Sequence, residues 1–101
     1  MKQPDVNIAI AETFCKLFKD LKFGRDLEFV EIDRSMPPLF QLTGEFEGRG
    51  KYDFTGLAKL FIENNGFNQS ARYDISGTVE VSEEDDSPDV EFVGLLSARK
   101  V

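Results

Sequence analysis

The stretch from Phe40 to Phe54 constrains the fold more than any other, because its side chains alternate strictly along fifteen residues. Every even-numbered position is apolar, aromatic or glycine, and every odd-numbered position is polar. A period of two is typical of a β-strand that buries one face and exposes the other to water. Because strands usually run about five or six residues, the stretch predicts two antiparallel strands joined by a turn.

The triplet Gly48-Arg49-Gly50 marks the position expected for that turn. A three-residue loop there pairs Phe46 with Tyr52 and sets Gly44 opposite Phe54, which keeps the aromatic side chains on one face. One long, bent strand with glycines at its bends is the alternative, since glycine within a strand often marks a bulge or kink.

An amphipathic helix is predicted for residues 5–23. Its apolar side chains recur at the spacing of one helical stripe, at Val6, Ile10, Phe14, Leu17, Phe18 and Leu21. Asp5 is the predicted N-cap, and Gly24 suits the position just after a helix.

A short second helix is predicted near residues 56–65. Leu57, Leu60 and Phe61 share one helical face in this segment. The alternative is a strand that closes in a turn at Asn65-Gly66.

Three further segments are predicted as strands. The first, Asp26 to Arg34, switches its apolar parity, which indicates a bulge near Phe29-Val30 or a strand buried on both faces. Ala71 to Ser82 alternates regularly, and Val90 to Ala98 is the last strand. Between these two strands, residues 83–89 contain five acidic side chains, a proline and no large apolar side chain, which predicts a loop.

The last strand carries Val93 and Leu95 on the parity that should face water. It is therefore expected to be a central strand, or one whose outer face meets a helix or another subunit.

The fold class that follows is α+β, in a single domain of residues 1–101. We expect the long N-terminal helix to pack on a curved antiparallel sheet of about five strands. A helix followed by a β-meander resembles the cystatin-like and related cone-shaped α+β folds in its topology, and the residues identify no family.

The net charge of −7 is distributed unevenly. Residues 1–60 carry nine basic and ten acidic side chains, whereas residues 61–101 carry three basic and nine acidic ones. This balance argues against a nucleic-acid partner, because binding to phosphates needs basic side chains. It favours a protein partner with a basic surface. A lone Cys15 and the lack of an export signal or of an apolar run near ~18 residues predict a cytoplasmic protein that is not inserted in a membrane.

Several kinds of catalytic and metal site are excluded by the residues present. The chain has no histidine and one cysteine, so it cannot form a Ser-His-Asp triad, a Cys-His pair or a His–Cys zinc site. Residues 48–51 lack the spacing of a P-loop, and residues 83–89 lack that of a calcium loop. Glu45 and Asp53 face each other in the predicted hairpin, but on its solvated face. We therefore expect no catalytic residue, no metal and no cofactor.

The first functional hypothesis is a non-catalytic protein that acts by contact with a partner protein, as a regulator, inhibitor or adaptor. Val93 and Leu95 are its predicted anchors. The acidic side chains predicted to steer a basic partner are Glu83, Glu84, Asp85, Asp86 and Asp89. Self-association as a homodimer through the last strand accompanies this hypothesis.

The second hypothesis is a small-molecule site in an apolar pocket of the curved sheet. Phe46, Tyr52, Phe54 and Tyr73 are its predicted lining, and glycines on the inward parity leave room for the ligand. An enzyme that uses carboxylates alone is compatible with such a pocket.

Overall fold

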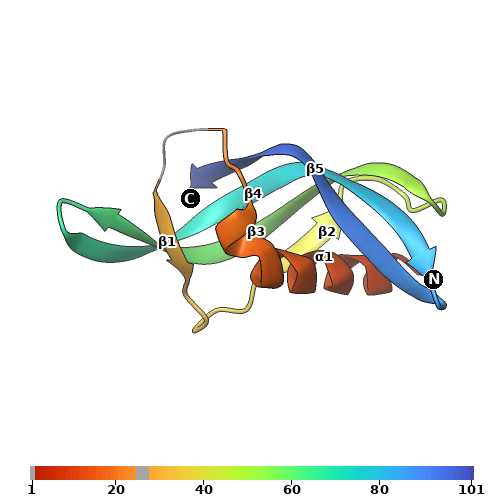
Figure 1. Ribbon diagram of the computed structural model, residues 1–101, viewed down its shortest axis with the longest axis horizontal. Coiled ribbons are helices and arrows are strands. Elements are labelled where there is room, and N and C mark those ends of the chain that lie inside the picture. The colour runs from red at the N-terminus through yellow and green to blue at the C-terminus, as the bar shows by residue number, and fades with distance from the viewer. Residues whose placement is uncertain (1, 25–27) are drawn as a thin grey trace.

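The computed structural model describes residues 2–24 and 28–101. In chain order, its elements are α1 (Gln3–Leu17), the 3₁₀ turn η1 (Phe18–Asp20), β1 (Phe29–Ile32), β2 (Leu39–Leu42), β3 (Gly50–Asn64), β4 (Phe67–Glu84) and β5 (Ser87–Lys100). Figure 1 shows the long strands β3, β4 and β5 with α1 lying against them. The fold is thus α+β, with an N-terminal helix on a five-stranded antiparallel sheet, as predicted. The expected curvature of the sheet stays a prediction.

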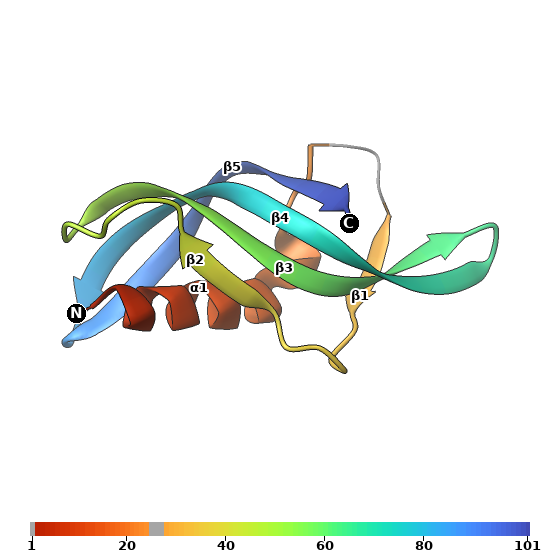
Figure 2. The same ribbon diagram turned by 180° about the vertical axis from the view of Figure 1, so that it is seen from behind.

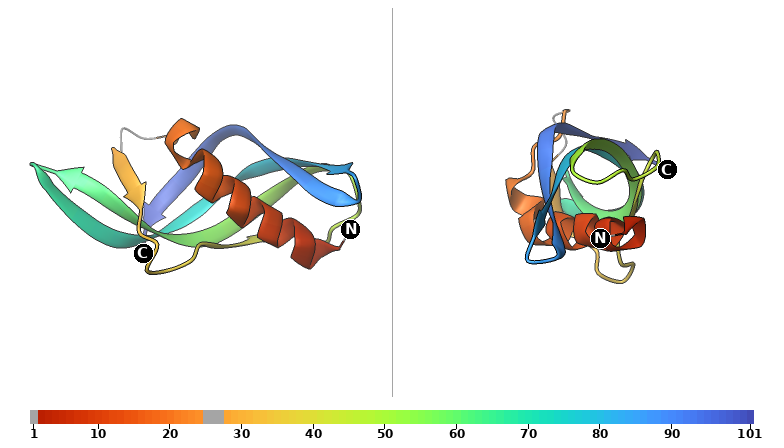
Figure 3. Two further views of the ribbon diagram at one scale, coloured as in Figure 1. Left: turned by 60° about the horizontal axis from the view of Figure 1, so that its bottom comes forward. Right: turned by 90° about the vertical axis from the view of Figure 1, so that its right-hand side faces the viewer.

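The sheet has the strand order β1-β3-β4-β5, with β2 also paired to β3. The two short strands share one edge of β3: β1 pairs with residues 60–62 of β3, and β2 pairs with residues 54–57. The last strand, β5, ends the order on the other side, so of the two alternatives given for it the central position is wrong. Figure 3 shows α1 running along one side of the twisted sheet. We call the face toward α1 the inner face and the opposite face the outer face.

The apolar stripe of α1 is the side that meets the sheet. Val6, Ile10 and Phe14 have no exposed surface, and Phe18 in η1 is nearly as buried. The ring of Phe14 lies 4.9 Å from that of Phe40 on β2, measured between ring centroids. Burying such side chains is the main force that holds an amphipathic helix on a sheet.

The ends of the helix differ from the predicted range of 5–23. Lys2 is the N-cap, and Asp5 lies one turn in, where its carboxylate accepts the Lys2 backbone N–H at 3.2 Å. At the other end, residues 22–24 leave the helix and pair with β5: the Leu96 N–H donates to the Lys22 carbonyl, and the Gly24 N–H donates to the Leu96 carbonyl, both at 3.0 Å. Hydrogen bonds to β5 therefore override the helical pattern of the sequence there.

The predicted second helix near residues 56–65 is wrong, and the strand alternative is correct. β3 runs through this segment and pairs with β4 along its whole length. Asn65 and Gly66 have φ values of 50° and 82°, which suit a two-residue hairpin turn. The spacing was misleading because β3 carries apolar side chains on both faces: Leu60 is buried on the inner face, while Leu57 and Phe61 lie on the outer one.

The tight turn at Gly48-Arg49-Gly50 and the single bent strand are both wrong. β2 and β3 do form an antiparallel pair, but Leu42 is opposite Phe54, and residues 43–49 form the connection. The observed register differs from the predicted one by two residues. Because a shift of two residues keeps each side chain on the same face of the sheet, the aromatic side chains still lie on the inner face. Glu45 does not face Asp53, because the Thr43 N–H donates to the Asp53 carbonyl at 3.0 Å.

The long connection is organised by Tyr52. Its hydroxyl accepts the Glu47 backbone N–H at 3.0 Å and donates to the Gly48 carbonyl at 2.7 Å. The ring of Tyr52 packs on Phe46 at a centroid distance of 5.4 Å. One side chain thus provides hydrogen-bond partners for two backbone groups of the connection, which stabilises this longer loop.

The predicted bulge in the first strand is confirmed, since the pairing of β1 with β3 shifts between Phe29 and Glu31. The predicted start of that strand, residues 26–27, lies outside the described residues. The acidic segment 83–89 is mostly strand and not loop. β4 continues to Glu84, and Asp85 and Asp86 form a two-residue turn with φ values of 50° and 64°.

The free edge of β2 is covered by a side chain of α1. The Leu42 backbone N–H donates to Asn7 Oδ1 at 3.1 Å, and Leu42 itself is 5% exposed. We expect Asn7→Ala to lower the free energy of unfolding by about 1–2 kcal/mol, because it leaves a buried donor without an acceptor. Urea denaturation measures the change. Asn68→Ala, at an exposed position on β4, is the control, and equal effects of the two variants would contradict this role of Asn7.

Gly56 on β3 faces Phe40 across the β2–β3 pair. A Cβ atom at Gly56 would collide with the Phe40 ring and with the Leu39 carbonyl oxygen, whereas one at Gly44 would have open space. We expect Gly56→Ala to destabilise the fold by about 1–3 kcal/mol through overpacking. The matched Gly44→Ala variant should melt close to the parent in a thermal scan. If both variants melt at the same temperature, the close approach of Phe40 does not require a glycine at position 56.

Candidate binding surfaces

The four side chains predicted to line a pocket lie in separate places. Phe54 is 1% exposed and packs between Phe40 and Phe92, at centroid distances of 5.7 and 5.5 Å. Tyr73 is buried against Phe29, and this burial raises the pKa of its hydroxyl. Phe46 and Tyr52 meet each other at the β2–β3 connection. None of the four lines a cavity described below.

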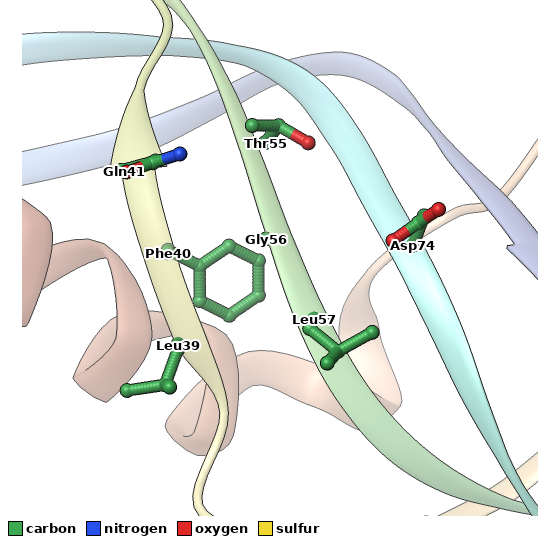
Figure 4. Close-up of a pocket in the computed structure, with 7 residues that line it drawn as sticks. All are labelled: Leu39, Phe40, Gln41, Thr55, Gly56, Leu57 and Asp74. Carbon is green, nitrogen blue, oxygen red and sulfur yellow. The ribbon is translucent and has the colours of Figure 1, made fainter. Parts of the chain in front are cut away.

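A depression on the outer face lies where β2, β3 and β4 run side by side (Figure 4). Its volume is about 340 Å³, and it is lined by Leu39, Phe40, Gln41, Thr55, Gly56, Leu57 and Asp74. Phe40 leans toward Gly56, and Leu39 is 73% exposed. Its lining offers one carboxylate, that of Asp74, and one hydroxyl, that of Thr55.

Two hollows adjoin Cys15. One lies where α1 and η1 meet β1, and the other lies between α1 and the segment that joins β1 to β2. Their volumes are about 330 and 440 Å³, and they share Cys15, Lys16 and Arg34. Partial burial raises the pKa of the Cys15 thiol, an effect that the nearby charge of Arg34 only partly offsets. The thiol is therefore protonated at neutral pH and is a poor nucleophile.

A groove runs between the first turns of α1 and the start of β5, on the inner side of the molecule. It measures about 420 Å³ and is lined by Asp5, Ile8, Ala9, Glu12, Asp86, Ser87 and Pro88. We call it the α1–β5 groove. Three of its side chains are carboxylates and none is basic, while Ile8 is 58% exposed. An acidic groove with an exposed aliphatic side chain suits a ligand that is both cationic and apolar.

Of the five predicted acidic residues, one lines this groove. Asp86 belongs to the lining, in the turn between β4 and β5. The others are exposed nearby on the same hairpin, at Glu83, Glu84, Asp85 and Asp89. The sequence did not predict that α1 lines part of this groove, although Asp5, Ile8 and Glu12 lie along one side of the predicted helix. The sequence holds no signal that this side lies beside the β4–β5 turn.

Val93 and Leu95 lie on the outer face, away from the α1–β5 groove. Val93 is opposite Thr78 and half-buried, and Leu95 is 62% exposed. Between them Gly94 has a φ of 75°, where the pairing of β5 with β4 is irregular. This bulge presents Leu95 to solvent.

Asp33 holds the segment after β1 against the sheet. Its carboxylate accepts the Ser70 hydroxyl at 2.6 Å and the Ser35 backbone N–H at 3.0 Å, and it lies 3.5 Å from Lys59 Nζ. These donors, with the Ser70 hydroxyl contributing most, hold the pKa of Asp33 well below its usual range. All these partners belong to the segment itself, β3 or β4, so the role of Asp33 is structural.

Within residues 2–24 and 28–101, no three or more acidic or cysteine side chains come together as metal ligands. No helix of the described chain has the length and apolar character needed to cross a bilayer. Comparisons with protein-family models, with curated proteins and with solved structures found no match to this chain.

The stability contributed by Asp33 should depend on pH. Because its folded-state pKa is depressed, the ionised carboxylate stabilises the fold above the unfolded-state pKa of about 3.9, and this contribution is lost as the pH falls below that value. We expect Asp33→Asn to melt at a lower temperature than the parent at pH 7, with the difference shrinking under acid conditions. Glu84→Gln, at the tip of the β4–β5 hairpin, is the control and should show no such trend. A difference that stays constant with pH would refute the ionic role.

Proposed function

We propose that this chain is a non-catalytic protein-binding module that holds a basic segment of a partner protein in the α1–β5 groove. The observation that carries the proposal is the lining of that groove: three carboxylates, an exposed isoleucine and no basic side chain. The expected regulator, inhibitor or adaptor of the sequence-based hypothesis acts through such a contact.

The lining supports a particular kind of ligand. Lysine and arginine carry their charge on a long aliphatic stem. The stem packs on Ile8, Ala9 and Pro88, and the charged group reaches Asp5, Glu12 or Asp86. Hydrogen bonds between such charged groups are stronger than neutral ones.

The other acidic residues of the β4–β5 hairpin add a second effect. Glu83, Glu84, Asp85 and Asp89 are exposed and make no ion pair with the described chain. Exposed charges of one sign accelerate the approach of an oppositely charged partner, and salt weakens that effect. A basic partner is thus attracted to the end of the molecule that carries the groove.

The cavities beside Cys15 support catalysis less well than the α1–β5 groove supports binding. The Cys15 thiol, the one strong nucleophile in the sequence, has a raised pKa and no histidine beside it. Catalytic nucleophiles usually need a lowered pKa or an adjacent base. A binding function therefore accounts for the described residues better than an enzymatic one.

Binding in the groove predicts unequal effects of two matched variants. Asp86→Asn and Asp89→Asn remove the same charge, but Asp86 lines the groove, whereas Asp89 lies on the outer face of the same hairpin. We expect Asp86→Asn to raise the Kd for a labelled peptide of alternating lysine and leucine about tenfold, because it removes a charged hydrogen bond. Asp89→Asn should have a much smaller effect. Fluorescence anisotropy measures both.

The asparagine in each variant tolerates left-handed backbone, so the turn at Asp86 keeps its conformation. A peptide with glutamate in place of lysine is the negative control, and Ile8→Ser tests the apolar floor. Equal weakening by the two asparagine variants would show that net charge alone attracts the peptide, and the groove assignment would then be wrong.

A further inference from the structure

The turn between β3 and β4 contains an asparagine that is followed directly by a glycine, Asn65 and Gly66. The pair formed by Asn64 of β3 and Phe67 of β4 closes this two-residue turn. In Figure 2 the turn lies at one end of the molecule, opposite the N-terminus of α1 and the turn between β4 and β5. Asn65 and Gly66 are both exposed, so water reaches both residues.

Asparagine is a chemically labile residue, because its side chain can react with the backbone that follows it. The backbone nitrogen of the next residue attacks the side-chain carbon Cγ, so that a bond from this nitrogen to Cγ forms and the bond from Cγ to Nδ2 breaks. The attacking nitrogen loses its proton, and the side-chain amide group takes up a proton and leaves as ammonia. Water then opens the succinimide ring at one of its two carbonyl carbons. One opening gives aspartate, and the other gives isoaspartate, in which the main chain runs through Cγ.

The surroundings of Gly66 leave its backbone nitrogen open to this reaction. A glycine has no side chain beside that nitrogen, and its backbone rotates more freely than that of any other residue. A Cβ atom built at Gly66 would meet no atom within 4 Å apart from its chain neighbours. Residues 65–70 are all exposed, so the backbone rotation that brings the nitrogen to Cγ displaces no buried side chain of this segment.

Two other asparagines of the chain lack these features. Asn7 precedes Ile8 within α1, and its Oδ1 accepts the Leu42 backbone N–H at 3.1 Å. Asn68 precedes Gln69 within β4, where it is paired with β3. In both cases a side chain stands beside the next backbone nitrogen, and the backbone belongs to a helix or a strand. These two residues are therefore comparisons for Asn65 within the same molecule.

The conformation of the turn separates the two products of the reaction. Asn65 has a φ of 50° and Gly66 a φ of 82°. Asparagine and aspartate both tolerate the left-handed region, so the aspartate product fits the same turn. Isoaspartate adds one carbon atom to the main chain between the two strands. The connection is then longer than the two-residue turn that the register of β3 and β4 requires.

We propose that Asn65 is a site of spontaneous deamidation and that the isoaspartate product disrupts the turn between β3 and β4. Water is the other reactant, and the chemistry needs no enzyme. The modification adds a carboxylate to the molecule at the end away from the α1–β5 groove. It does not depend on the function proposed for that groove.

Incubation of the folded chain at body temperature, followed by peptide mapping with tandem mass spectrometry, tests the proposal. We expect the mass gain of an amide replaced by an acid at position 65, as a mixture of aspartate and isoaspartate, while Asn7, Asn64 and Asn68 keep their amides. The rate should be higher in mildly alkaline than in neutral buffer, because the attacking nitrogen must lose its proton. The proposal is overturned if Asn65 keeps its amide as long as Asn68 does, or reacts only when urea unfolds the chain.

A matched variant exchanges the two turn residues, by Asn65→Gly together with Gly66→Asn. The order glycine–asparagine also suits a two-residue hairpin turn, but Phe67 then follows the asparagine and its side chain hinders the attack. We expect deamidation of this variant to be about tenfold slower than that of the parent, because the hindrance raises the activation barrier. Equal rates in the two proteins would contradict the role of Gly66.

Hydrogen exchange of the backbone amides in residues 63–69 measures the effect on the turn. The isoaspartate form, separated from the parent by ion exchange, should exchange faster than the parent in this segment. Asn65→Asp reproduces the other product and should exchange as the parent does, since aspartate keeps the left-handed turn. If the isoaspartate form exchanges as slowly as Asn65→Asp, the proposed disruption of the turn is wrong.

Discussion

The contact of Phe14 with the sheet is the interaction on which the rest of the structure depends. Phe14 has no exposed surface, and its ring lies against Phe40 of β2 and Phe92 of β5, at centroid distances of 4.9 and 6.4 Å. One helical side chain thus touches strands from two different parts of the chain. Phe54 of β3 lies between those same two rings. Because aromatic rings bury large areas, this cluster supplies much of the apolar contact that joins helix and sheet.

Around this cluster, individual polar side chains determine the paths of the connecting segments. Asn7 occupies the edge of β2, Tyr52 holds the β2–β3 connection, and Asp33 anchors the segment after β1. Each provides hydrogen bonds to backbone groups that have no strand partner. Each such bond contributes modestly to stability, and the bond to Leu42 has the largest expected effect because Leu42 is 5% exposed.

The sequence was a good guide to which faces are buried and a poor guide to where elements end. Parity and helical spacing correctly placed Val6, Ile10, Phe14, Phe54 and Ile75 in the core, because both depend on local geometry alone. The boundaries failed where distant segments decide them. The sequence pattern predicts that a helix ends at Lys22 and Gly24, but both residues pair with Leu96. The spacing from Leu57 to Phe61 predicts a helix, but this segment is a strand that pairs with β4.

The candidate surfaces were predictable to a similar degree. The acidic cluster of residues 83–89 could be inferred from composition, although it was predicted as a loop, and the outward position of Leu95 could be inferred from strand parity. The α1–β5 groove could not be inferred, because it requires Ile8 and Pro88 to come together from positions far apart in the chain.

The far end of the β3–β4 hairpin has a thermodynamic consequence of its own. Among the described residues, the pairing of β1 with β3 ends at Ile62 and the pairing of β5 with β4 ends at Tyr73. Residues 63–69 therefore form a two-stranded ribbon that projects from the body (Figure 1). Two strands without a third, or a helix beneath them, are marginally stable in water. This ribbon, which carries the 74% exposed Phe67, can therefore open and close while α1 and the core remain folded. The molecule thus combines a cooperative body with a small unit whose opening costs much less free energy than global unfolding.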